Sequence, residues 1–217
     1  MKLFLTQMRI DISCLLDNSA QIFALIATSI TMYLLLRFGI EPDAEAKILP
    51  SFLLGAMILT LLYGTHSTFV EDNSHDRISG WHSAKLSMEW IIFSRFLAHL
   101  LCSALPLIIC FFALNLLEGI AINQAFTIAY IMLQVAIFVV ACGMMAAALG
   151  VSFAGSAALS HLLTLPFLFS VVIFASDAMV NAQSLNIASN AMIASDWLML
   201  SCAIFTPISC FICAKLL

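Results

Sequence analysis

Charged side chains are scarce in this chain. Asp, Glu, Lys and Arg make up 9% of its 217 residues, whereas hydrophobic residues make up 63% and the mean hydropathy is +1.10. In a typical soluble domain about a quarter of the residues are charged. No basic cluster is present that could neutralise nucleic-acid phosphates. The composition therefore predicts an integral membrane protein and argues against a nucleic-acid-binding one.

Motifs of enzymes and of ion-coupled transporters are also missing. The chain has no HExxH, no GxSxG and no glycine-rich nucleotide loop. It has no pair of acidic residues inside a predicted span, because Glu118, Asp177 and Asp196 fall near span ends. We therefore expect a non-catalytic membrane subunit, with ATP hydrolysis in a separate cytoplasmic partner. We predict no metal site, and Cys210 and Cys213 form a CxxC on a predicted span, where packing is the expected role.

Six apolar segments are long enough to cross a membrane as helices, which takes about 20 residues. The fold class is therefore all-α, a polytopic membrane protein forming a single domain over residues 1–217. We expect the third span to be tilted or to bend at Pro106, and we expect a polar loop over 177–196. The predicted spans cover about 21–36, 49–69, 90–117, 124–151, a fifth segment ending near 175, and 197–216.

Residues 1–18 predict an amphipathic helix that lies in the membrane interface. Its polar positions recur every three or four residues on one face, and its apolar positions form a stripe on another. A cytoplasmic helix packed on protein is the alternative. The polar positions are Lys2, Thr6, Arg9, Ser13 and Asp17, and the apolar positions are Leu5, Met8, Ile12 and Leu15.

The distribution of Lys and Arg predicts that both termini are cytoplasmic, because short cytoplasmic loops carry the excess of basic residues. This orientation also places residues 70–89 in the cytoplasm, between the second and third spans. The predicted inner residues are Lys2, Arg9, Arg77, Lys85 and Lys215, and the predicted outer ones are Arg37 and Lys47.

The segment from Glu71 to Arg95 holds seven of the twenty formal charges. We expect residues 70–89 to be a cytoplasmic coupling loop that docks the ATPase, with a short helix parallel to the membrane over 69–81. A solvated connector between two spans is the alternative. The candidate docking residues are Glu71, Asp72, Asp76 and Arg77.

Arg95, His99 and His161 form a candidate intramembrane polar site, because ionisable residues inside a membrane are costly. Arg95 and His99 are four residues apart and so share a helix face. Arg95 could instead extend to the interface. Each histidine could bind a haem iron or metal, or simply hydrogen-bond to a neighbouring helix.

Several short segments resemble the haem exporter protein B family, and the resemblance extends over nearly the whole chain. The resemblance implies a permease with the fold of type-2 ABC exporters, in the bacterial inner membrane or an organellar inner membrane. It implies three partners: an ATP-binding subunit, a further haem-handling membrane subunit and a haem chaperone. Haem is then a transported substrate or transient ligand, and no cofactor is bound covalently. The segments are 69–72, 94–99, 105–108, 163–166 and 173–175.

The loop departs from the family pattern, since it has no proline between Phe69 and Arg95 and reads differently over 76–81. Several functions therefore stay open beside a haem-linked permease. The chain could be a non-transporting scaffold of a haem-handling complex or a permease for another apolar substrate. It could also be an intramembrane haem- or quinone-binding protein without an ATPase.

Overall fold

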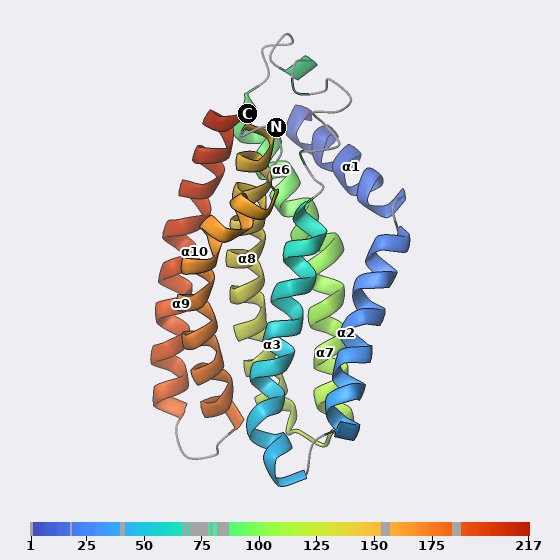
Figure 1. Cartoon of the computed structure of the whole chain (residues 1–217), viewed down its shortest axis with the longest axis vertical. Coiled ribbons are helices and arrows are strands. Elements are labelled where there is room, and N and C mark those ends of the chain that lie inside the picture. Colours follow the sequence, from blue (N-terminus) through green and yellow to red (C-terminus); the bar gives the residue numbers. More distant parts are fainter. Residues whose placement is uncertain are drawn as a thin grey trace.

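The computed structural model of the protein describes residues 2–17, 19–39, 42–66, 69, 78, 80–81, 87–152, 157–183 and 188–217. All regular secondary structure in these residues is helical, and six long helical segments lie side by side (Figure 1). The elements are α1 (Lys2–Asp17), α2 (Ser19–Gly39), α3 (Pro42–His66), α6 (Met88–His99), the π-helix η1 (Leu100–Ala104), α7 (Leu105–Leu117), α8 (Ile122–Ser152), α9 (Ala157–Gln183) and α10 (Ala188–Leu216).

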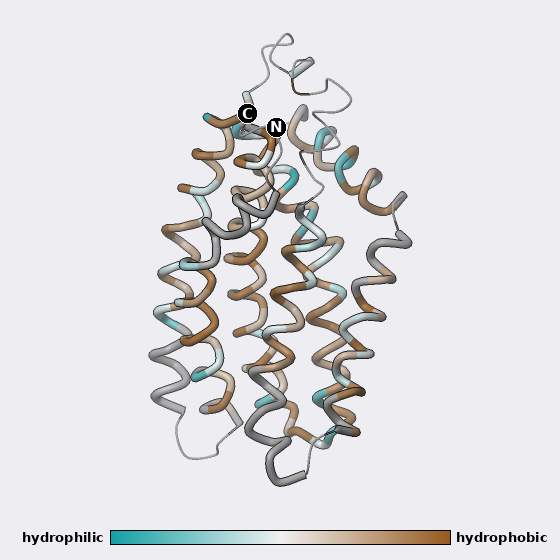
Figure 2. The backbone as a smooth tube through the Cα atoms, in the orientation of Figure 1, coloured by the Kyte–Doolittle hydropathy of each residue, from teal (hydrophilic) through white to brown (hydrophobic). Residues whose placement is uncertain are grey.

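The helices have the length and the apolar surface of membrane spans. Among the described residues, three segments are long and apolar enough to cross a bilayer: Met88–Leu117, Ile122–Val151 and Asp196–Leu216. Shorter apolar helices cover Ile26–Leu35, Phe52–Thr65 and Pro166–Val180. Hydrophobic residues line the middle of the helices (Figure 2), and large ones such as Phe23 and Ile173 are exposed on the outside. This is the surface of a membrane protein.

Helix α8 is the core of the molecule. It packs against α3, α7, α9 and α10, and its residues 138–148 are all buried. Small residues dominate this stretch, including Ala141, Gly143 and Ala146, and they let neighbouring helices approach closely, as in other membrane bundles. Thr65 of α3 lies very close to Gly143. A Cβ added to Gly143 would lie 2.0 Å from the Thr65 Oγ1.

The third predicted span is interrupted by a π-helix just before Pro106. The N–H of Leu105 bonds to the carbonyl of Leu100, five residues back. Proline has no N–H and its ring crowds the preceding turn, so the widened turn accommodates Pro106 within a continuous helical segment.

Both backbone and side-chain hydrogen bonds stabilise the turn between α7 and α8. Gly119 has φ 79, and Ile120 N–H bonds to Asn115 O while Gly119 N–H bonds to Leu116 O, each at 3.1 Å. These bonds form a Schellman motif, in which glycine is favoured at the left-handed position. The Tyr33 hydroxyl on α2 donates to the Glu118 carboxylate and joins this turn to α2.

The structure corrects two predicted connections. Residues 177–196 were expected to be a polar loop, but α9 continues to Gln183 and α10 begins at Ala188. In α9, Ala175, Ala178 and Met179 are buried while Asp177 is exposed, a helical spacing that the polar composition conceals. The second span was expected to begin near residue 49, but α3 begins at Pro42, and proline is favoured in the first helical turn.

Candidate functional site

Helix α1 packs on the start of α6, at the end of the molecule that holds both termini (Figure 1). An aromatic cluster forms part of this contact. The Phe4 ring lies 5.6 Å from Trp90, edge on, and 6.0 Å from Phe93, which is the range of favourable aromatic pairs. The cluster fixes the N-terminal half of α1 against the first turns of α6.

Asp11 is the polar centre of the same contact. Its side chain is only 5% exposed, and it accepts hydrogen bonds from Ser94 Oγ at 2.5 Å and from Gln7 Nε2 at 3.0 Å. Bonds of this kind to a carboxylate are short and stronger than neutral ones. Asp11 therefore ties the middle of α1 to α6.

Arg95 extends this contact to Phe69 and Trp81, on either side of residues 70–80. Its Nε lies 3.5 Å from Asp11 Oδ1, and its guanidinium lies 5.2 Å from the centre of the Trp81 ring and 5.8 Å from that of Phe69. A cation within about 6 Å of an aromatic ring is attracted to its face. The set of Asp11, Ser94, Arg95, Phe69 and Trp81 is called the Arg95 junction below.

The Arg95 junction contains two charged side chains, those of Arg95 and Asp11, that are largely shielded from water. The side chain of Arg95 is 13% exposed, so losing either member of the ion pair removes an opposite charge from beside a largely buried one. Phe69 and Trp81 flank residues 70–80, and Phe69 is fully buried. One guanidinium on α6 therefore contacts Phe69 and Trp81 as well as Asp11 of α1.

His99 lies one turn further along α6 from Arg95 and is 3% exposed, directly before the π-helix. The prediction that Arg95 and His99 share a helix face agrees with these positions. His161 belongs to α9, but its side chain lies outside the described residues. Within the described part of the chain, no three His, Cys, Asp or Glu side chains cluster as metal ligands would.

The four predicted docking residues Glu71, Asp72, Asp76 and Arg77 lie outside the described residues. Of the loop over 70–89, the structure describes residues 78, 80–81 and 87–89. The docking assignment therefore stays a prediction.

Helix α1 has both features that were weighed as alternatives. One face packs on α6, while Leu5 and Leu16, on the adjacent face, are 57% and 55% exposed. The polar positions Thr6, Arg9 and Ser13 are exposed on a third face. Such a helix can rest on protein and present apolar side chains to the lipid interface at once.

Sequence reasoning missed Asp11 and Ser94 as site residues. The signal for Asp11 was present, because it is a charged residue three positions after Met8 and four before Leu15, on the apolar side of α1. Ser94 had no signal of its own. The partners of Arg95 also went unpredicted, since they come from segments far apart in the sequence.

The chain matches the model of a known protein family over nearly its whole length, including all residues of the Arg95 junction. The model of the CcmB protein family matches residues 1–214. Among curated proteins, none matches the chain.

Proposed function

The chain belongs to the CcmB family, and we propose that it is the permease subunit of an ATP-driven transporter that translocates haem or drives release of a haem-loaded chaperone. The family makes it a membrane component of the haem exporter of cytochrome c maturation, which works with the CcmA ATP-binding subunit in an ABC-type system. This subunit is generally non-catalytic, so the energy comes from its partner.

The proposed topology is six spans in one permease domain, 1–217, with the fold of type-2 ABC exporters. The spans are α2, α3, the α6–η1–α7 segment, α8, α9 and α10. At 1.5 Å per residue, the 21 residues of α2 reach about 30 Å, the thickness of a hydrocarbon core. The two termini lie at the same end (Figure 1), which agrees with an even number of spans and with both termini in the cytoplasm. The membrane is the inner membrane of a bacterium or organelle.

The coupling role proposed for the loop rests chiefly on the Arg95 junction. Arg95 contacts Phe69 and Trp81, on either side of the acidic residues, and pairs with Asp11 of α1. An ATPase that docks on residues 70–89 through Glu71, Asp72, Asp76 and Arg77 would thus move α1 and the third span together. Arg95, His99 and His161 remain the proposed polar site inside the membrane, and the further haem-handling subunit and haem chaperone are the proposed additional partners.

Two groups of variants test separately whether the loop binds the ATPase and whether the Arg95 junction couples ATP hydrolysis to the chaperone. Replacing Glu71, Asp72 and Asp76 together by Ala should abolish co-purification with the ATPase. Arg95→Met should leave co-purification intact but remove stimulation of ATP hydrolysis by the haem-loaded chaperone. Asp177→Ala, which removes an exposed acid at the opposite end of the molecule, should change neither result.

Either of two results would contradict the proposal. If the triple variant retains the ATPase, the loop is not the docking site. If wild-type complexes bind haem-loaded chaperone without any change in ATP hydrolysis, the chain acts as a non-transporting scaffold.

A further inference from the structure

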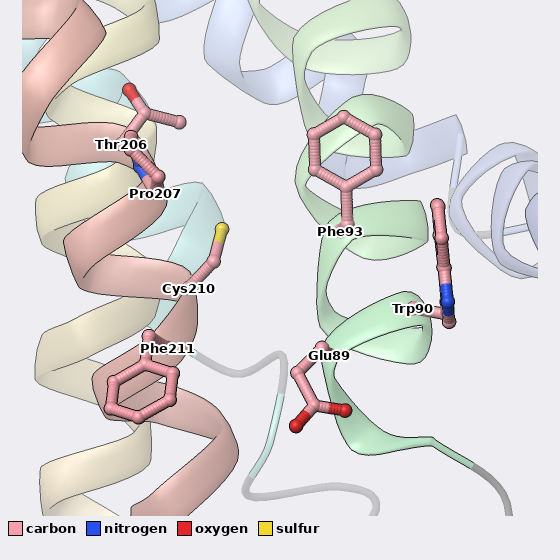
Figure 3. A pocket seen from close by; sticks show the side chains of 7 residues that line it. All are labelled: Glu89, Trp90, Phe93, Thr206, Pro207, Cys210 and Phe211. Atoms are coloured by element: carbon pink, nitrogen blue, oxygen red, sulfur yellow. The ribbon is translucent and has the colours of Figure 1, made fainter.

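A cavity of about 410 Å³ lies between α6 and α10, apart from the Arg95 junction (Figure 3). This volume falls in the range of pockets for small organic ligands, about 300–1,000 Å³. The lining residues are Glu89, Trp90 and Phe93 of α6 and Thr206, Pro207, Cys210 and Phe211 of α10.

The cavity runs along the helices and is apolar over most of its wall. Glu89 and Phe211 lie at one end, and Phe93 and Thr206 lie at the other (Figure 3). Four or five residues of helix separate the two ends, which is about 6–8 Å. Trp90 and Phe211 are 59% and 58% exposed, so the cavity opens on the outside of the bundle, where lipid lies.

Opposite charges flank the mouth of this cavity. Glu89 is exposed, and no hydrogen bond or ion pair joins it to another residue in the part of the chain that the structure describes. The Lys215 Nζ lies 5.8 Å from the centre of the Phe211 ring, on the turn of α10 that follows. Both charges are at the end of the molecule that holds the termini, which is where lipid headgroups of that leaflet are placed. Trp90 beside Glu89 also suits the interfacial position that tryptophan prefers.

We propose that this cavity binds a phospholipid with an ethanolamine headgroup. One acyl chain enters between Phe93 and Thr206, the ammonium donates to the Glu89 carboxylate, and the phosphate pairs with Lys215. A choline headgroup cannot donate a hydrogen bond to Glu89, and an anionic glycerol headgroup brings no cation to it. A transmembrane helix is about 10 Å across, so a protein partner could insert no more than a side chain here.

The test uses quenching of Trp90 fluorescence by lipids brominated on the acyl chains. Replacing Trp81 and Trp197 by Phe leaves Trp90 as the sole tryptophan, since the chain has three. In vesicles that mix brominated and unbrominated lipids, phosphatidylethanolamine should bind near Trp90 about threefold more tightly than phosphatidylcholine, the advantage expected of one added hydrogen bond at an exposed site. Trp197, on the exposed surface of α10 toward its other end, should show no such preference when it is the sole tryptophan.

Two substitutions assign the preference to the two charges. Glu89→Gln should remove the preference for ethanolamine over choline, while Lys215→Met should weaken both lipids similarly. Equal quenching of Trp90 by the two lipids, or a preference that survives Glu89→Gln, would overturn the proposal. In the assembled transporter, native mass spectrometry should detect a retained phosphatidylethanolamine that Glu89→Gln loses. Its absence from the wild-type complex would show that a protein partner covers this face and would overturn the proposal as well.

Discussion

Asp11 is the residue whose loss should most disturb the contact between α1 and α6. It is nearly buried, it accepts hydrogen bonds from Ser94 and Gln7, and it forms an ion pair with Arg95. A buried ion pair is not a large source of stability by itself, but a single buried charge is strongly destabilising. This asymmetry makes the pair testable by a double-mutant cycle.

We expect Asp11→Ala to lower the free energy of unfolding by on the order of 3 kcal/mol, because it leaves the Arg95 charge without its partner. Arg95→Met should have a similar cost, and the double variant should lose clearly less than the sum of the two. Unfolding by SDS titration in mixed micelles measures all three. Arg9→Met is the control, because Arg9 is exposed on the opposite side of α1. Additive losses would show that Asp11 and Arg95 do not interact.

Replacing Gln134 is expected to raise the free energy of unfolding and not to lower it. It lies inside the bundle on α8 and is 4% exposed, and neither its Oε1 nor its Nε2 has a hydrogen-bond partner among the described residues. A buried amide in that state is destabilising. Gln134→Met, which keeps the length of the side chain, should therefore raise the free energy of unfolding by about 1–2 kcal/mol.

The same SDS titration measures this gain. Gln124→Met, at a half-buried position near the start of α8, should change stability far less. A loss of stability in the Gln134 variant would show that its amide is hydrogen-bonded in the membrane. If the variant is more stable but transports less, Gln134 is retained for function.

At the scale of elements, the packing of α3 against α8 depends on one glycine. A Cβ on Gly143 would lie 2.0 Å from the Thr65 Oγ1 and 3.0 Å from the Thr65 Cβ. The Thr65 hydroxyl bonds to the carbonyls of Leu61 and Leu62, each at 3.1 Å, so it has little freedom to move aside. The helices would have to separate to accept a methyl group.

Gly143→Ala should therefore lower stability by about 2–3 kcal/mol, the cost of overpacking. Adding Thr65→Gly should recover most of that loss, because it removes both clashing atoms. Gly55→Ala is the matched control, since nothing lies within 4 Å of its Cβ position in α3. It should be neutral or stabilising by about 0.5–1 kcal/mol. A neutral Gly143→Ala would contradict the close approach of these two helices.

The sequence predicts most of these elements but not how they end. The ends of the third span and the start of α8 agree with the structure to within about two residues, because apolar runs there stop at sharp changes in polarity. The end of α9 and the start of α10 were missed, because Asn and Ser in 181–190 resemble a loop although both helices extend beyond the apolar segment. The π-helix had a signal in Pro106, but proline indicates a disturbed helix without specifying its form.

The contacts of the Arg95 junction could not be predicted from the helical periodicity of the sequence. Arg95 was identified as a candidate from its place in a span, but its partner Asp11 is 84 positions away and its ring contacts come from residues 69 and 81. A helical pattern specifies which face a residue occupies and not which helix covers that face. Tertiary packing decides that, and here it places the Arg95 guanidinium in contact with Asp11, Phe69 and Trp81.

At the scale of the whole molecule, the helices give the bundle two ends. Helix α1 and the last turn of α10 belong to the end with the termini, whereas α2 meets α3 at the opposite end (Figure 1). The described exposed residues Ser87 and Ala121 lie at opposite ends of the third helical segment. These two positions can therefore report which end faces the cytoplasm.

We expect Ala121→Cys, in a chain whose seven native cysteines are replaced by Ala, to react with a membrane-impermeant maleimide in intact cells. Ser87→Cys should react only when the cytoplasmic side is opened, because the excess of basic residues holds that end inside. Denaturing each variant before labelling gives the full extent of reaction and controls for expression. Labelling of both positions from one side would contradict the crossing of this segment. The reverse pattern would place the coupling loop outside, where no cytoplasmic ATPase could reach it.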